Sequence, residues 1–151
     1  MSFIAGVVLD RVDTAAQFTL GTIAEMQDGK VYKYITYSEE AAATDGVAGE
    51  VAYYVSATGY AANDVTSDLS ASDEVGAGVL QATLSDNEFG WIQIEGPATL
   101  TIAFTAGADG DPMTPTGAGD GTLDVIVAAT SAVCGFAGDA SANELLCMFP
   151  R

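Results

Sequence analysis

Histidine is absent from this chain of 151 residues, and cysteine occurs only twice. Without histidine, neither a Ser-His-Asp triad nor a Cys-His pair can be built. Zinc sites with imidazole ligands are excluded for the same reason, and two thiolates are too few for a transition-metal centre of their own. These absences predict a protein that is not an enzyme and that uses no cofactor and no metal.

Basic residues are also scarce: four lysines and arginines stand against 21 acids, which gives a formal net charge of −17. Nucleic acids and anionic membrane surfaces are bound through Lys and Arg, so we expect neither as a partner. We interpret the acids first as a solvated surface. Binding of divalent cations, or docking on a basic partner, is the alternative interpretation.

Long hydrophobic segments are missing as well. No run approaches the roughly 20 apolar residues that cross a bilayer as a helix. The first residues, MSFIAGVVLDRVD, have no basic start and become charged after nine residues, which is atypical of a signal peptide. We therefore expect the protein to be made and used without secretion, in a reducing compartment where both cysteines can remain free thiols.

The sequence does contain short apolar runs separated by Gly, Asp, Asn and Thr at intervals of about 8–12 residues. This spacing predicts an all-β fold, a single small barrel or sandwich-like domain of many short antiparallel strands with long loops. Residues 38–43 alone look helical, and residues 106–121 are expected to form a loop. Strands are expected at residues 23–26, 31–37, 50–56, 76–83, 89–95, 98–105, 122–128, 132–137 and 144–149.

Two hairpins can be predicted in detail. Asp28-Gly29 lies between two β-prone runs and is a strong turn signal. The following strand should place Val31, Lys33, Ile35 and Tyr37 on one face and Tyr32, Tyr34 and Thr36 on the other.

The second predicted hairpin is centred between Ala140 and Ser141. It would set Cys134 opposite Cys147, Phe136 opposite Leu145, and Ala132 opposite Phe149, all on one face. We interpret Cys134 and Cys147 as paired buried side chains; a cross-strand disulfide and a reactive thiol are the alternatives.

Carboxylate chemistry stays open, because two acids can hydrolyse a glycoside. Glu88 and Glu95 flank an aromatic segment, and Asp109 and Asp111 resemble part of a calcium loop. Many acids here stand beside glycine, as turn residues do, and Pro112 interrupts the calcium pattern. We favour turns over either site.

Three segments resemble a family of phage proteins. They are Phe18-Thr19-Leu20-Gly21-Thr22 with Asp28-Gly29-Lys30-Val31-Tyr32-Lys33-Tyr34, then Gly76-Ala77-Gly78-Val79, then Phe89-Gly90-Trp91-Ile92-Gln93-Ile94-Glu95-Gly96-Pro97-Ala98. In this order, over about residues 17–150, the chain resembles the capsid decoration (cement) proteins of tailed bacteriophages. Phe89 stands where Tyr is commoner in the third segment.

The resemblance implies a structural protein on the outer surface of the virion. Such proteins commonly form homotrimers, bind the major capsid protein and clamp neighbouring capsomers. A phage-borne glycan-binding or host-adhesion module is the alternative, and it would present exposed aromatic side chains. In the third segment, Gly96-Pro97 should form a bulge or corner that lets one long strand serve two parts of the barrel. Trp91 is either a core residue or an interface anchor.

The N-terminal run is the last candidate. Phe3, Ile4, Val7, Val8 and Leu9 form an apolar stretch that precedes the region of resemblance. An unpaired hydrophobic strand in water is an aggregation hazard, so something should cover it. We favour a sister subunit or the capsid over the protein's own sheet. This divides the chain into an arm, residues 1–16, and a β-rich decoration domain, residues 17–151.

Overall fold

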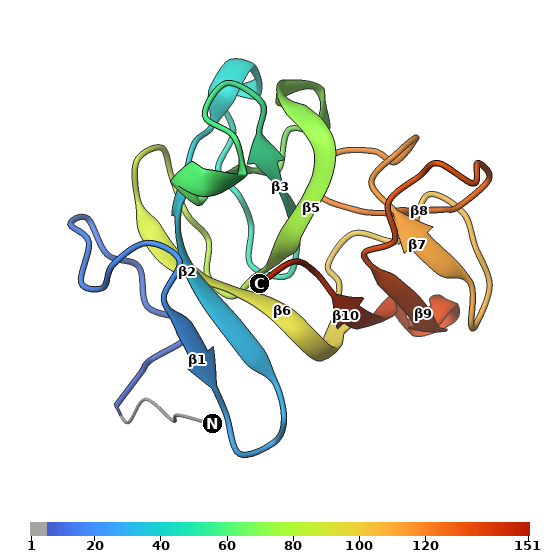
Figure 1. Cartoon of the computed structure of the whole chain (residues 1–151), viewed down its shortest axis with the longest axis horizontal. Coiled ribbons are helices and arrows are strands. Elements are labelled where there is room, and N and C mark those ends of the chain that lie inside the picture. Colours follow the sequence, from blue (N-terminus) through green and yellow to red (C-terminus); the bar gives the residue numbers. More distant parts are fainter. Residues whose placement is uncertain (1–5) are drawn as a thin grey trace.

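A computed structural model describes residues 6–151 and confirms the all-β prediction (Figure 1). The strands in this range are β1 (Ile23–Glu25), β2 (Val31–Tyr37), β3 (Val51–Val55), β4 (Asp64–Thr66), β5 (Ser72–Leu80), β6 (Phe89–Thr99), β7 (Pro112–Thr114), β8 (Asp124–Val125), β9 (Gly135–Asp139) and β10 (Glu144–Met148). Single 3₁₀ turns are η1 (Glu40–Ala42), η2 (Tyr60–Ala62), η3 (Leu69–Ala71) and η4 (Ala140–Ala142). The helix expected at 38–43 is thus one short turn.

The first predicted hairpin is confirmed. β1 and β2 pair antiparallel with Ala24 opposite Tyr32. Gly29 closes the turn with a φ of +84°, which glycine adopts at little cost, and its N–H donates to the Met26 carbonyl at 3.0 Å. The two faces of β2 also separate as expected, because Ile35 joins the barrel interior while Tyr34 joins a cluster outside it.

Five strands close into a small barrel in the order β2-β4-β3-β5-β6, and β6 pairs again with β2. Closure leaves these strands few free edges. One pair departs from the purely antiparallel prediction: β2 and β4 run parallel, with Thr36 opposite Asp64. β4 itself was not predicted, because a strand of three residues carries too short an alternation to recognise.

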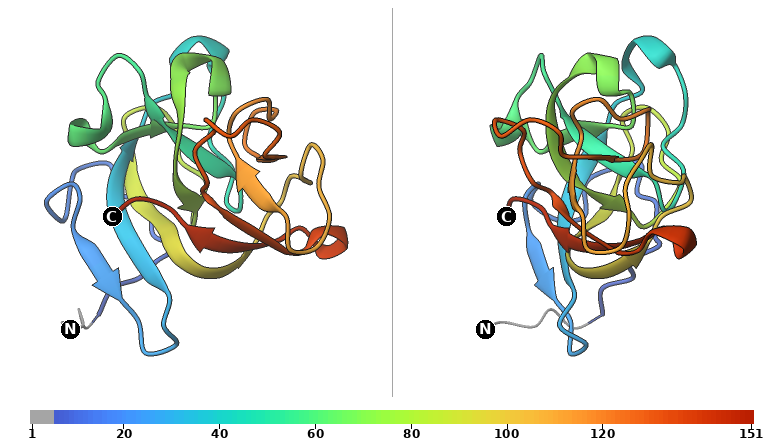
Figure 2. Two further views of the ribbon diagram at one scale, coloured as in Figure 1. Left: turned by 45° about the vertical axis from the view of Figure 1, so that its right-hand side comes forward. Right: turned by 90° about the vertical axis from the view of Figure 1, so that its right-hand side faces the viewer.

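β6 joins the barrel to a second sheet. Its first part pairs with β2 and β5, and its last residues, from Glu95 onward, pair with β10. The second sheet continues in the order β10-β9-β7-β8, and it lies on the right of Figure 1 and on the right of the left-hand view in Figure 2. Gly96 has a φ of +91°, and the β2 register shifts beside Ile94, so the predicted corner is confirmed.

Two strand predictions were wrong in this region. The strand expected at 98–105 contributes only its first two residues to β6, and residues 100–105 have no regular secondary structure. The loop expected at 106–121 contains β7, which begins at Pro112 and pairs with both β8 and β9. Proline at the first position of a strand weakens the sequence signal without preventing pairing.

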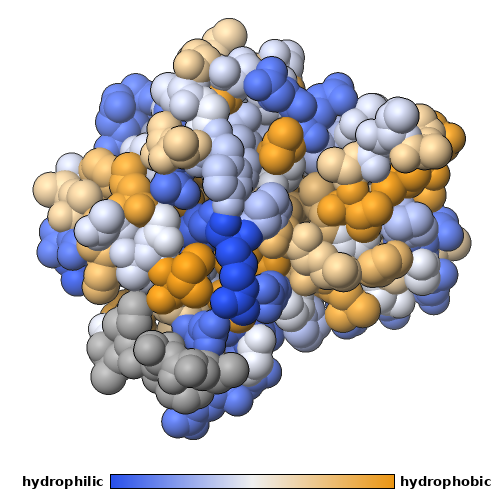
Figure 3. Space-filling model, in the orientation of Figure 1, coloured by the Kyte–Doolittle hydropathy of each residue, from blue (hydrophilic) through white to orange (hydrophobic). Residues whose placement is uncertain are grey.

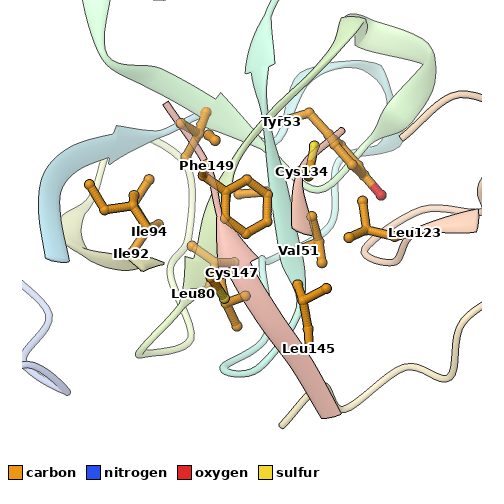
Figure 4. Close-up of a cluster of buried hydrophobic side chains, with 14 of the residues drawn as sticks. Val51, Tyr53, Leu80, Ile92, Ile94, Leu123, Cys134, Leu145, Cys147 and Phe149 are labelled. Atoms are coloured by element: carbon orange, nitrogen blue, oxygen red, sulfur yellow. The ribbon is translucent and has the colours of Figure 1, made fainter. Parts of the chain in front are cut away.

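A single hydrophobic core fills the barrel and extends under the second sheet. Figure 4 shows Val51, Leu80 and Ile92 from the barrel beside Leu145 and Leu123 from the second sheet side. Because both parts share these contacts, they form one domain.

The two glycines of the Gly76-Ala77-Gly78-Val79 motif lie where other chain segments come closest to β5. A Cβ at Gly76 would lie 2.5 Å from Cys134 Sγ, and one at Gly78 would lie 2.8 Å from the Gln93 carbonyl oxygen. Real Cβ atoms do not approach so closely. The motif therefore has a packing explanation.

The end of the chain fastens the second sheet to the barrel. The Phe149 N–H donates to the Ile94 carbonyl at 3.0 Å. The Arg151 guanidinium donates to Glu95 at 2.8 and 3.2 Å and to Glu25 at 2.9 Å. These contacts link β10, β6 and β1.

Candidate interaction surfaces

The N-terminal hydrophobic run lies partly outside the described residues, and Phe3 and Ile4 belong to that part. Val7 and Leu9 are half-buried against an aromatic cluster on the outside of the barrel. Val8 is 55% exposed. Of the predicted contact residues in this run that the structure describes, Val8 alone leaves most of its surface exposed.

This aromatic cluster, here called the outer-wall cluster, has Ala24, Tyr32, Tyr34 and Trp91 at its centre, with Val7, Leu9, Phe18, Leu20, Met26 and Phe89 packed around them. Trp91 is only 2% exposed. The Phe18 ring packs edge-on against the Trp91 ring, with 5.3 Å between the ring centres, and the centre of the Tyr34 ring lies 5.1 Å from that of Trp91. Of the two interpretations of Trp91, burial therefore confirms the core residue and contradicts the interface anchor, because Phe18 and its neighbours in the same chain pack against the ring.

Asp13 fixes that segment in place. Its carboxylate is buried and accepts a hydrogen bond from the Tyr34 hydroxyl at 2.7 Å, and Arg11 Nε lies 2.5 Å from its other oxygen. Its backbone forms two hydrogen bonds of 2.9 Å with Phe89 at the start of β6. Burial raises the pKa of Tyr34 to about 12. The described part of the expected arm thus packs onto the domain, and residue 16 is not a structural boundary.

The cysteines are buried as predicted, but they do not face each other. Cys147 lies opposite Gly135, and Leu145 lies opposite Ala137, one residue from the expected register. Phe136 and Ala132 are consequently exposed, contrary to the prediction. Both thiols are free, and burial raises the pKa of each to about 12.

The register differs because of the turn. Asp139 accepts hydrogen bonds from the N–H groups of Ser141 and Ala142, which builds η4. Asn143 then adopts a left-handed φ of +56°, a conformation that asparagine tolerates. A bulge follows between Glu144 and Leu145. The symmetric turn assumed from the sequence lacks this extra residue.

The burial of the Lys33 side chain was not predicted from the sequence. Its ammonium donates to the Tyr54 hydroxyl at 2.9 Å and to the Pro150 carbonyl at 3.5 Å, and it lies 4.8 Å from the Tyr60 ring centre. Burial lowers the pKa of Lys33. All its contacts are internal, so the side chain helps to hold the chain end against the barrel.

The acids considered for chemistry have structural partners. Glu95 binds Arg151, and this hydrogen bond lowers the pKa of Glu95, whereas a glycosidase acid needs a raised pKa. Asp109 accepts from the Ala140 N–H and Asp111 from the Ala108 N–H, each at 2.8 Å, as turn residues do. Residues 6–151 contain no group of three or more His, Cys, Asp or Glu side chains placed to hold a metal ion.

Aromatic side chains are mostly inside the molecule. Among the described residues, the only aromatic side chains that are exposed are Tyr60 on η2 and Phe136 on β9, and they belong to different parts of the fold. A shallow groove of about 610 Å³ runs between β5, β6 and β10, with Gln81, Gln93 and Glu144 among its lining residues, and no aromatic residue lines it. Residues 6–151 therefore form no aromatic stacking platform for a sugar.

The outer face of the second sheet carries a row of apolar side chains. Leu146 on β10 lies between Pro97 of β6 and Phe136 of β9, and Phe136 lies opposite Pro112 of β7. Ile126 continues the row, because its N–H donates to the Pro112 carbonyl at 3.0 Å. We call these five residues the outer row. The sequence does indicate an apolar outer face here, because residues on both faces of β10 are apolar.

Comparison with protein-family models, curated proteins and solved structures finds no match. Within residues 6–151, no helix has the length and apolar character required to span a membrane.

Proposed function

We propose that this chain is a structural virion protein that binds the outer surface of a tailed-phage head and cements neighbouring capsomers. The observation that carries the proposal is the part played by the motif residues. Gly76 and Gly78 permit close packing, and the segment from Gly90 to Pro97 forms the strand that joins the barrel to the second sheet. The resemblance therefore involves residues that determine this architecture.

The absence of histidine and the structural engagement of the candidate acids support a role without catalysis. The strong negative charge fits a protein that avoids nucleic acid and anionic membranes. On this proposal the protein is made in the host cytoplasm and uses no cofactor. Its partners are the major capsid protein and itself, as a homotrimer that multiplies weak contacts into avidity.

A glycan-binding or adhesion module receives less support. Such a module stacks sugars on exposed aromatic rings, and the two exposed rings in the described part of the chain lie on separate elements. The polar groove lacks an aromatic lining residue.

The test uses purified protein and heads of the source phage that lack it. We expect cosedimentation with the heads, and density at fixed positions on their outer surface in cryo-electron microscopy. Exposed charge contacts are screened by salt, with a Debye length of about 8 Å at physiological strength. Occupancy should therefore fall in part at about 1 M salt. Folded protein that fails to bind heads, or binds as isolated monomers, would contradict the proposal.

A further inference from the structure

Several exposed apolar side chains lie close together in sequence and structure at β8–β10. Val127 is 93% exposed, and Phe136, Leu146 and Met148 are 36%, 43% and 57% exposed. Figure 3 shows such side chains gathered over the region of β7–β10, on the right of the view. The outer row gives this patch a regular geometry, because it crosses five paired segments at right angles to the strands.

The outer row ends near an open hollow. A hollow of about 490 Å³ lies between Met148, Gly96 and the Gly29 turn. Met148 shares the outer face of β10 with Leu146, because side chains alternate along a strand. The outer row beside this hollow suits a partner that has an apolar surface with one projecting side chain.

One margin of the ribbon is acidic. Glu144 lies two residues before Leu146 on the same face and opposite Asp139, and Asp109 reaches the adjoining turn through the Ala140 N–H. Hydrogen bonds from Ser141 and Ala142 lower the pKa of Asp139, which keeps it charged. The sequence has no Lys or Arg between Lys33 and Arg151. The margin therefore calls for basic groups on the partner.

A second copy of this chain has few basic side chains free to bind the acidic margin. Arg11 is paired with Asp13, Arg151 is held by Glu25 and Glu95, and Lys33 is buried. Of the basic residues in the described range, Lys30 alone is neither buried nor in an ion pair. Two identical acidic margins would instead repel each other.

We infer that the outer row and its acidic margin form the docking surface for a different protein, one whose contact surface has an apolar centre and a Lys- or Arg-rich edge. This inference rests on the proposed function, under which the partner is the major capsid protein. Self-association then uses another surface of the molecule.

The experiment compares two double variants with matched exposure. Phe136→Ser with Leu146→Ser removes the centre of the outer row. Val47→Ser with Val75→Ser is the control, because these valines are 44% and 37% exposed and lie on the barrel side. Both variants are checked for unchanged fold by circular dichroism and for oligomeric state by analytical ultracentrifugation. Titration of heads that lack the protein measures the affinity.

We expect the outer-row variant to keep its oligomeric state and to bind heads at least tenfold more weakly than wild type, while the control binds normally. Glu144→Lys should also weaken binding at low salt, and less so at about 1 M salt. Equal binding by the outer-row variant would overturn the inference and leave the proposed function intact. Loss of oligomers in that variant would make the row a contact between copies, which also overturns it. If wild type itself does not bind, the proposed function fails.

Should the outer-row variant be unfolded, Leu146→Lys provides the second test. The positive charge of the new lysine would lie on the outer face and repel the basic edge of the partner, so the affinity for heads should fall in the same way. Normal binding by a folded Leu146→Lys protein would refute the inference.

Discussion

At the scale of single residues, close packing around β5 decides which side chains are allowed. Gly76 faces the Cys134 sulfur and the Phe149 ring from the second sheet side, so a methyl group has no space there. Overpacking of a filled core displaces neighbours and costs about 1–3 kcal/mol.

Gly76→Ala should therefore lower the free energy of unfolding by about 1–3 kcal/mol, as measured by urea denaturation. Gly119→Ala is the matched control, because a Cβ there would meet nothing closer than 4.0 Å. Equal destabilisation by the two variants would show that the cost lies in the backbone and not in the contact with Cys134.

Cys134 and Cys147 should be inert in the native protein. Burial raises the pKa of each thiol to about 12, so little reactive thiolate exists at pH 8. Iodoacetamide at pH 8 should leave the folded protein unmodified and label two thiols after unfolding in urea, as counted by mass spectrometry. Rapid labelling of the folded protein would contradict this, and a protein without titratable thiols after unfolding would indicate a disulfide.

At the scale of elements, the N-terminal segment behaves as a cover for the barrel wall. Asp13 holds it by hydrogen bonds to Tyr34 and to the Phe89 backbone, and Val7 and Leu9 extend the contact. Partial burial of two apolar side chains contributes on the order of 1–3 kcal/mol.

The double variant Val7→Ser with Leu9→Ser should accordingly lose about 1–3 kcal/mol of stability, read as a lower midpoint in urea. Val8→Ser serves as its control and should leave the midpoint unchanged, because Val8 is mostly exposed. If the control destabilises as much as the double variant, the cover does not form as described. Head binding by Val8→Ser then tests whether this residue still meets a partner.

At the scale of the whole molecule, buried tyrosines make stability sensitive to alkaline pH. Burial raises the pKa values of Tyr32, Tyr34, Tyr37, Tyr53 and Tyr54 above the usual value of about 10. The native state therefore keeps protons that the unfolded chain releases. By linkage, this stabilisation is complete below pH 10 and is lost as pH rises further.

The unfolding midpoint should hence fall steeply above about pH 10. Lys33 acts in the opposite direction, because its lowered pKa makes the folded state gain stability as pH rises toward the ordinary lysine value. Five tyrosines outweigh one lysine. Denaturation curves between pH 8 and 11.5 test this, with tyrosinate absorbance at 295 nm as the second readout. Early tyrosinate formation in folded protein would contradict the buried assignment.

Local sequence patterns were enough to predict the all-β class, the β1–β2 hairpin, the two faces of β2 and the corner at Gly96-Pro97. Each depends on local chemistry: a glycine that accepts positive φ, a proline without an N–H, and alternation of apolar residues along one strand. The burial of Cys147 followed from the same alternation along β10, whereas Cys134 is buried although Phe136, two residues further on, is exposed.

The segments that cover each apolar face of the barrel could be identified only from the tertiary structure. Trp91 and Val7 are apolar in the sequence whether their neighbour is the same chain or another protein, and only the fold shows that Val7 packs against the cluster to which Trp91 belongs. The register of β9 on β10 depended on η4 and a bulge, and a shift of one residue sends Phe136 to solvent. The register of a strand pair and the burial of a face depend on contacts between segments far apart in the chain. The alternation of apolar residues within one strand therefore cannot predict them.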